Sequence, residues 1–279
     1  MSRIQDILAK AEREGTTRTV RDHADEAAPS VVTRIPIALA ERPSPPLAPA
    51  VAAVGTFPST DVPPATRTAQ ATLHPALVAA IAPHSQVAEQ YRALRARVAQ
   101  REELSPLRVI AITSPGTGEG KSVTAANLAI AMAQEFQRSI LLMDADLRAP
   151  VVHSLFGISD RPGLSEVLSG EATLDEALLV LPELNLTVLP AGAIPEYPSE
   201  LLGSAAMRRT LDVLRMRFDR VVVDLPGVLP LADVRTVAPM IDGVVLVVRV
   251  GVTHRPAVDE ALTTFDQQKV LGLVLNEAH

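Results

Sequence analysis

Residues 108–124 decide the fold of this chain: Arg-Val-Ile-Ala-Ile-Thr-Ser-Pro-Gly-Thr-Gly-Glu-Gly-Lys-Ser-Val-Thr. The apolar, β-branched run 109–112 predicts a buried strand, and the closely spaced glycines after it predict a tight turn. Lys121 and Ser122 then open an apolar-periodic segment that predicts a helix. A strand, a glycine-rich turn and a helix N-terminus in this order favour a phosphate-binding loop, because backbone N–H groups and the helix dipole converge on phosphate oxygens.

We therefore expect this loop to bind a nucleoside triphosphate. Lys121 would supply positive charge to the β- and γ-phosphates, and the Ser122 hydroxyl is a natural Mg²⁺ ligand. The strict motif G-x-x-x-x-G-K-[ST] has glycine where this chain has Pro115. A bare glycine-rich turn is the alternative, but the strand, loop, Lys-Ser pair and helix together argue against it. The residues expected to contact the nucleotide are Gly116, Thr117, Gly118, Glu119, Gly120, Lys121, Ser122 and Val123.

The composition limits the class of protein. The 279 residues carry a net charge of -6, with two Tyr and no Trp, which argues against nucleic acid as a partner. The absence of Cys excludes disulfides and cysteine-based zinc or iron–sulfur sites. The N-terminus lacks the apolar core of a signal peptide, and no apolar run is long enough for a direct membrane span. We expect a cytoplasmic protein.

Three regions follow from the change in composition along the chain. Residues 1–14 show a short amphipathic helix pattern, which fits either a solvated terminal helix or a docking helix for a partner protein. Residues 15–72 are rich in Pro and Ala and show no sustained period, so we expect a disordered linker. Residues 73–279 should form the P-loop ATPase or kinase domain, which begins with a helical segment centred on 85–100.

From residue 108 onward, strand-like apolar runs alternate with helical segments. Several strands are nearly continuous Val, Ile and Leu, as expected when helices cover both faces of a sheet. The alternation predicts an α/β P-loop NTPase fold with a doubly wound, mostly parallel sheet, whose ligands bind beyond the carboxyl ends of the strands. The expected strands are 108–113, 139–143, 186–190, 220–224, 243–249 and 270–275, and the expected helices are 121–136, 204–217, 230–240 and 255–268.

Three aspartates lie at the predicted strand ends: Asp144, Asp146 and Asp224. A buried carboxylate is costly unless it meets a cation, and Mg²⁺ bound to a triphosphate is a suitable one. We expect Ser122, Asp144 and Asp224 to ligate the metal. We expect Lys121, Asp144 and Asp146 to be catalytic, with one of the paired aspartates acting as general base. Aspartates that merely form turns at strand ends are the alternative.

Other charged residues give weaker signals. Asp233, near the start of a predicted helix, is interpreted as a first-turn acid that complements the helix dipole. Arg148 is interpreted as a surface salt-bridge residue. The six His show no spacing typical of metal ligands.

The ordered set of motifs resembles the bacterial tyrosine kinases (BY-kinases) of capsule and exopolysaccharide assembly, which are P-loop proteins related to MinD and ParA. The resemblance spans roughly residues 80–277. The loop 113–122 is similar to the Walker A motif of the family, 141–150 to its second motif, Walker A′, and 218–226 to its Walker B motif. The remaining matches are 163–170, 189–192, 198–203, 242–249 and 271–276.

The resemblance implies an ATP- and Mg²⁺-dependent tyrosine kinase that a membrane protein of polysaccharide chain-length control or export recruits to the inner membrane. Glu89, Arg92 and Arg95 match the E-x-x-R-x-x-R motif, which implies subunit contacts in a ring-shaped homo-oligomer. Ion pairs at i,i+3 on a solvated helix are the alternative. Asn276 matches the position whose amide contacts adenine in related ATPases.

Two departures from the family bear on function. The family normally ends in a tyrosine cluster, whereas this sequence stops at His279 and contains only Tyr91 and Tyr197. Walker B usually reads Asp-Thr-Pro-Pro, and 224–227 here reads Asp-Leu-Pro-Gly. Two alternatives stay open: a non-catalytic, nucleotide-gated regulator of a polysaccharide export complex, and a MinD/ParA-type ATPase. The second is disfavoured by Gly116, which stands where those ATPases have a signature lysine.

Overall fold

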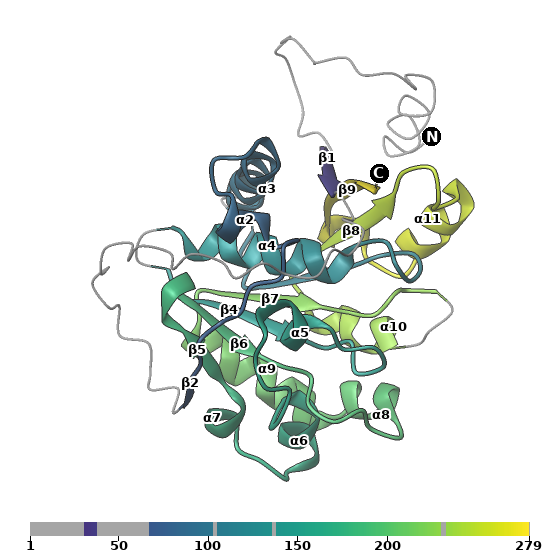
Figure 1. The fold of residues 1–279 in the computed structure, drawn as a ribbon. Coiled ribbons are helices and arrows are strands. Elements are labelled where there is room, and N and C mark those ends of the chain that lie inside the picture. The colour runs from purple at the N-terminus through teal and green to yellow at the C-terminus, as the bar shows by residue number, and fades with distance from the viewer. Residues whose placement is uncertain (1–30, 38–66, 103–104, 136–137, 230–232, 279) are drawn as a thin grey trace.

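The structure is a computed structural model and describes residues 31–37, 67–102, 105–135, 138–229 and 233–278. Within these residues, nine strands form one sheet in the order β1-β9-β8-β3-β7-β4-β6-β5-β2 (Figure 1). All neighbouring strands are parallel except β5 and β6. The strands are β1 (Val31–Ile37), β2 (Arg67–Thr68), β3 (Val109–Thr113), β4 (Ile140–Asp144), β5 (Leu179–Leu181), β6 (Leu186–Leu189), β7 (Arg220–Asp224), β8 (Gly243–Arg249) and β9 (Val270–Ala278).

Helices cover both faces of the sheet, which confirms the predicted doubly wound, mostly parallel α/β fold. In Figure 1, α2, α3 and α4 lie on one face, and α6 to α9 lie on the other. The helices are α2 (Val78–Ile81), α3 (Gln86–Glu102), α4 (Lys121–Ala133), α5 (Val152–Phe156), α6 (Leu164–Ser169), α7 (Leu174–Ala177), α8 (Pro198–Leu202), α9 (Ala205–Arg217), α10 (Asp233–Val237) and α11 (Arg255–Leu262), with 3₁₀ turns η1 (Pro182–Leu184), η2 (Ala238–Met240) and η3 (Gln267–Lys269).

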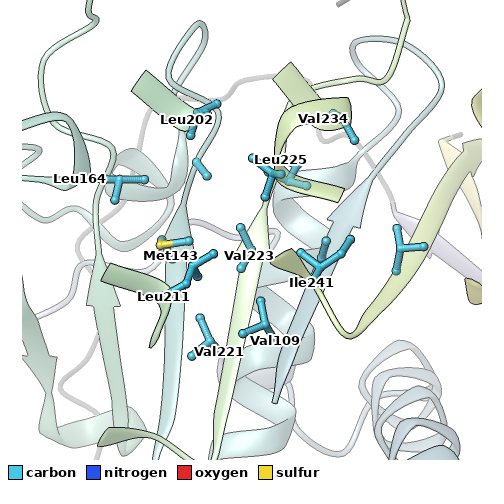
Figure 2. Packing of buried hydrophobic residues seen from close by; sticks show 14 of the residues in the cluster. Val109, Met143, Leu164, Leu202, Leu211, Val221, Val223, Leu225, Val234 and Ile241 are labelled. Atoms are coloured by element: carbon cyan, nitrogen blue, oxygen red, sulfur yellow. The ribbon is translucent and has the colours of Figure 1, made fainter. Parts of the chain in front are cut away.

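Two hydrophobic clusters, one on each face, hold the helices to the sheet. Successive residues of a strand point to opposite faces. In β3, Ile110 and Ile112 therefore join the cluster that contains residues of α3 and α4, whereas Val109 and Ala111 join the cluster on the α9 face. Figure 2 shows part of the second cluster, including Val109 and Leu211. Burial on both faces explains why these strands are continuously apolar in the sequence.

All six predicted strands are present, and β9 continues past its predicted end to Ala278. Two predicted helices are shorter than expected. In the described part of 230–240, α10 begins at Asp233 and changes to a 3₁₀ turn that contains Pro239, which donates no backbone hydrogen bond. The predicted helix 255–268 ends at Leu262, just before two β-branched threonines of low helix propensity.

The prediction of a disordered linker over 15–72 is wrong where the structure has strands. Val31–Ile37 (β1) pairs with β9, and Arg67–Thr68 (β2) pairs with β5, at the two edges of the sheet. β1 contains several β-branched residues, and its Pro36 is tolerated because one side of an edge strand needs no hydrogen bonds. The rest of the linker up to residue 66 and the predicted N-terminal helix lie outside the described residues.

Candidate active site

The loop between β3 and α4 has the backbone of a phosphate-binding loop. Gly118 and Gly120 have φ angles of +74° and +89°, in the left-handed region that glycine adopts without strain. Helix α4 begins directly afterwards, at Lys121. The first N–H groups of a helix have no partner within it, so they are available to an anion at this end. The predicted nucleotide contacts from Gly116 to Val123 thus lie on the loop after β3 and on the first turn of α4.

The loop after β7 lies against this turn. The backbone N–H of Leu229 donates to the carbonyl of Pro115 at 2.9 Å. A Cβ atom on Gly227 would lie only 2.5 Å from the carbonyl oxygen of Gly116, so this close approach requires glycine. The two unusual residues of the motifs, Pro115 and Gly227, therefore belong to one contact between the Walker A and Walker B loops.

The three predicted carboxylates gather beside Lys121. Asp144 and Asp224 end adjacent parallel strands and are in register with each other. The Lys121 ammonium lies 2.6 Å from Asp146 Oδ2 and 3.6 Å from Asp224 Oδ1. It also donates to Ser122 Oγ at 3.0 Å. All five of these side chains are buried, so the structure brings together every predicted catalytic and metal-binding residue.

The cluster carries more negative than positive charge. Burial, and then the charge of Asp224, raise the pKa of the Asp144 carboxyl. Burial also raises the pKa of Asp224, although Lys121 opposes this effect. For Lys121, burial disfavours the charged form, but the carboxylates of Asp224 and Asp146 outweigh it and raise its pKa. One ammonium thus faces three carboxyl groups, and a further cation would relieve the repulsion among them.

The donor set fits Mg²⁺ with a nucleotide rather than a metal held by protein alone. Among the described residues, no group of three or more His, Cys, Asp or Glu side chains is arranged to hold a metal ion. Mg²⁺ is typically bound by one or two carboxylates together with phosphate oxygens and water. Both carboxylate oxygens of Asp224 are buried and have no hydrogen-bond partner among the described residues, as expected for a ligand of such a cation.

Asp144 and Asp146 have different surroundings, because β4 ends at Asp144 and does not include Asp146. The Asp144 oxygens accept from the backbone N–H groups of Asp146 and Val152, both at 3.1 Å. Asp146 accepts from the N–H of Ala149 at 3.1 Å and binds Lys121 with its other oxygen. Asp144 therefore lies next to Asp224, whereas Asp146 forms a salt bridge with Lys121.

Asn276 reaches the P-loop from the end of β9. Its side-chain amide donates to the Glu119 carbonyl at 2.9 Å, and its buried Oδ1 has no partner among the described residues. The Glu119 carboxylate accepts from the Gly116 N–H at 2.8 Å and from the Thr253 hydroxyl. The predicted base-contacting residue and the phosphate loop are thus joined through Glu119. Sequence reasoning did not single out Thr253, which belongs to no motif.

Arg148 and Asp233, which the sequence treated separately, form an ion pair between an exposed guanidinium and a buried carboxylate. Two guanidinium nitrogens of Arg148 donate to the two Asp233 oxygens at 2.5 and 3.1 Å. The Ser199 hydroxyl also donates to Asp233. Burial opposes the charge of Asp233, but the hydrogen bonds from Arg148 and Ser199 lower its pKa overall. Arg148 is an exposed salt-bridge residue, as predicted, and its partners connect the Walker A′ loop to α8 and α10.

The residues of the E-x-x-R-x-x-R motif all have partners within the chain. Arg92 binds the Glu89 carboxylate through Nε at 2.9 Å, one turn away on α3. Arg95 donates to the Ala131 carbonyl at 2.7 Å and lies 3.2 Å from the Glu135 carboxylate. The Glu89–Arg92 pair fits the alternative of an ion pair along the helix, whereas the Arg95 contacts attach α3 to the end of α4. The predicted subunit contact stays a prediction.

The fold and this site define a P-loop nucleotide-binding protein. A family model, the CobQ/CobB/MinD/ParA nucleotide binding domain, matches residues 110–277. The chain is 37% identical over 203 residues to the tyrosine-protein kinase YwqD of Bacillus subtilis, covering 72% of this chain and 85% of YwqD. It is 38% identical over 201 residues to the succinoglycan biosynthesis transport protein ExoP of Rhizobium meliloti, covering 70% of this chain but only 25% of ExoP.

Among solved structures, the kinase domain of the Escherichia coli tyrosine kinase ETK is similar, with a TM-score of 0.69 and 29% identity. The match covers 72% of this chain and 80% of that domain. The chain belongs to the CobQ/CobB/MinD/ParA nucleotide-binding family and, within it, to the bacterial tyrosine kinases. No helix in the described part of the chain has the length and apolar character to cross a membrane.

Proposed function

We propose that the chain uses Mg²⁺-ATP to phosphorylate tyrosine in proteins and that it supports the synthesis or export of a bacterial polysaccharide. The observation that carries the proposal is the buried cluster of Lys121, Ser122 and three carboxylates at the end of the P-loop. Tyrosine as the acceptor is supported by the relatives YwqD and ETK, both of which are named tyrosine kinases.

In this proposal, residues 116–123 surround the phosphates and Asn276 contacts the adenine through its unpartnered amide oxygen. Asp224, Asp144 and Ser122 hold the metal, which supplies positive charge against the phosphate oxygens when it is bound. The Lys121 ammonium stabilises charge that develops on the β- and γ-phosphates.

Asp146 and the phosphates compete for the Lys121 ammonium, which lies 2.6 Å from Asp146. A bound triphosphate would draw this ammonium away and leave the Asp146 carboxylate able to accept the proton of the attacking tyrosine hydroxyl. Asp144, in register with Asp224, then contributes mainly to the metal. The general base is thus assigned to Asp146 rather than left between the two aspartates.

The test is phosphorylation of a Glu-Tyr copolymer by the full chain with labelled ATP, with and without Mg²⁺. We expect label on tyrosine only with Mg²⁺, and we expect Lys121→Met and Asp144→Asn to abolish it. Lys269→Met and Asp212→Asn are matched controls outside the cluster and should leave it unchanged. Release of phosphate into water without labelled tyrosine would contradict a kinase and favour an ATPase or a nucleotide-gated regulator.

The proposed cellular role rests on ExoP, of which the chain covers only a quarter. A domain of this kind forms part of a longer protein named for polysaccharide transport, so we propose that this chain acts as a cytoplasmic homo-oligomer recruited to the inner membrane by a chain-length or export protein. Deleting the gene should lower polysaccharide output, and wild type should restore it. If Asp144→Asn also restored full output, the role would not depend on phosphoryl transfer.

A further inference from the structure

Glu119, in the loop between β3 and α4, is a buried carboxylate whose two oxygens both accept hydrogen bonds. One oxygen accepts from the Gly116 N–H at 2.8 Å, and the other accepts from the Thr253 hydroxyl. The Thr253 oxygen in turn accepts from the backbone N–H of Arg249 at 3.0 Å, so its own proton is directed to Glu119. Because a buried carboxylate is costly without donors, these bonds hold Glu119 in one position.

Asn276 is held by the same segments that Glu119 joins. Its side-chain amide donates to the Glu119 carbonyl at 2.9 Å, and its backbone carbonyl accepts from the Val250 N–H at 2.9 Å. Val250 and Thr253 belong to the loop between β8 and α11, and the strands β9, β8 and β3 are neighbours in the sheet. The phosphate-binding loop, the loop after β8 and the end of β9 are therefore joined at Glu119.

The bond to Glu119 decides which end of the Asn276 amide is free. A carbonyl oxygen only accepts hydrogen bonds, so the NH₂ group of Asn276 must face Glu119. The buried Oδ1 atom is left without a partner among the described residues. An acceptor in this place fits adenine, whose exocyclic amine donates, and opposes guanine, whose corresponding oxygen also accepts. The orientation of this one amide thus distinguishes the two purines.

From these contacts we propose that Thr253 and Glu119 are positioning residues that set the preference of the site for adenine over guanine nucleotides. The inference rests on the proposed function, in which Asn276 contacts the base. The Thr253 hydroxyl holds the Glu119 carboxylate, and the Glu119 carbonyl holds the Asn276 amide. Without the bond from Thr253, Glu119 can shift and the Asn276 amide can rotate, so that its NH₂ group would face the base and suit guanine.

The test measures dissociation constants of the full chain for Mg²⁺-ATP and Mg²⁺-GTP by isothermal titration calorimetry. We expect wild type to prefer ATP, and we expect Thr253→Val to reduce this preference about 3- to 10-fold, as when one hydrogen bond is lost. Thr253→Ser keeps the hydroxyl and should keep the wild-type preference. Thr263→Val is the matched control and should change neither constant, because the Thr263 hydroxyl donates to the Glu260 carbonyl outside the site.

A double-mutant cycle with Asn276→Ala tests whether Thr253 acts through Asn276. Asn276→Ala should lose the preference for ATP, and adding Thr253→Val should reduce it no further. Additive losses would overturn the proposal. It would also be overturned if Thr253→Val bound ATP and GTP more weakly by the same factor, because that is the effect of a bond that only supports the loop.

The same measurements separate this inference from the proposed function. If wild type binds ATP with no preference over GTP, the assignment of Thr253 and Glu119 is wrong while nucleotide binding stands. A Thr253→Val variant that keeps the full preference for ATP would also overturn the assignment, since the bond to Glu119 would then play no part in selecting the base. If wild type binds neither nucleotide, the proposed function itself has failed.

Discussion

Asp224 and Asp233 are both fully buried at the same end of the molecule, yet their surroundings are opposite. Neither oxygen of Asp224 has a hydrogen-bond partner among the described residues, and its nearest cation is the Lys121 ammonium at 3.6 Å. Asp233 receives two bonds from Arg148 and one from Ser199. Burial accordingly raises the pKa of Asp224, whereas the donors around Asp233 lower its pKa overall.

The comparison separates two uses of a buried carboxylate. When all its hydrogen bonds are made within the chain, as at Asp233, the carboxylate connects segments of the fold. When they are not made, as at Asp224, the group costs stability until a ligand arrives. Such unfavourable sites are typical of functional centres. Asp224 should thus matter most for chemistry, and Asp233 most for folding.

The largest expected effect is on catalysis. Asp224→Asn should lower phosphoryl transfer to the copolymer about 100- to 1000-fold, as when one charged stabiliser of a transition state is removed. At a temperature where Asp233→Asn stays folded, its rate of phosphoryl transfer should be at most about 10-fold lower than that of wild type. The effect is smaller because Asp233 contacts Arg148 and not the nucleotide. Steady-state rates of phosphoryl transfer by the two variants measure the difference. Equal losses would remove the distinction between the two carboxylates.

The next effect is on stability. Asp233→Asn should destabilise the chain by about 1–3 kcal/mol, because Arg148 loses its charged partner; the exposed part of Arg148 limits the cost. Urea unfolding without nucleotide measures this change. Asp212→Asn, an exposed acid on α9, is the control and should change stability little. An unchanged midpoint for Asp233→Asn would show that the ion pair contributes no stability.

Asp224→Asn should shift stability the other way, by on the order of 1–3 kcal/mol in favour of the folded state, when nucleotide and Mg²⁺ are absent. A raised pKa means that the folded chain holds the proton more tightly than the unfolded chain. The stability of wild type should therefore fall as pH rises from the ordinary value of 3.8 to about 8, where Asp144 has titrated. Unfolding midpoints across this range should show a shallower slope in Asp224→Asn. If the stability of wild type instead rose with pH over this range, burial would not be raising the pKa values of Asp144 and Asp224.

The smallest effect on stability concerns an exposed pair. Glu89 is 67% exposed and binds Arg92 one turn away, so Glu89→Ala should change the free energy of unfolding by no more than about 0.5 kcal/mol. If the motif also forms subunit contacts, the same variant should dissociate the oligomer. Size-exclusion chromatography with light scattering tests this, and unchanged assembly would leave Glu89 with only its role along the helix.

Much of the central sheet and of the site could be predicted from local sequence. Strands such as β3 and β7 are continuous apolar runs that end in a glycine turn or an aspartate, and the loop before α4 needs glycines where φ is positive. The short elements α5 to α8 and β5 escaped prediction, because four to six residues of helix or three of strand show no measurable period. β1 was hidden in a Pro- and Ala-rich region.

Contacts between distant segments could not be predicted. Arg148 and Asp233 are 85 residues apart, and Asn276 and Glu119 are 157 apart. Neither pair has a spacing that indicates contact, since loop length and crossover path decide which side chains meet. The same holds for Gly227, whose need to be glycine arises only from its approach to Gly116.

The sequence alone determined that the chain has a P-loop, an α/β sheet with aspartates at its strand ends, and the motifs of a tyrosine kinase, because periodicity, glycine placement and charge are local properties. The tertiary structure decided which carboxylates lack partners and which are paired. Those differences depend on burial and on donors supplied by other segments, and the free energy of a buried charge depends on such donors more than on its place in the chain.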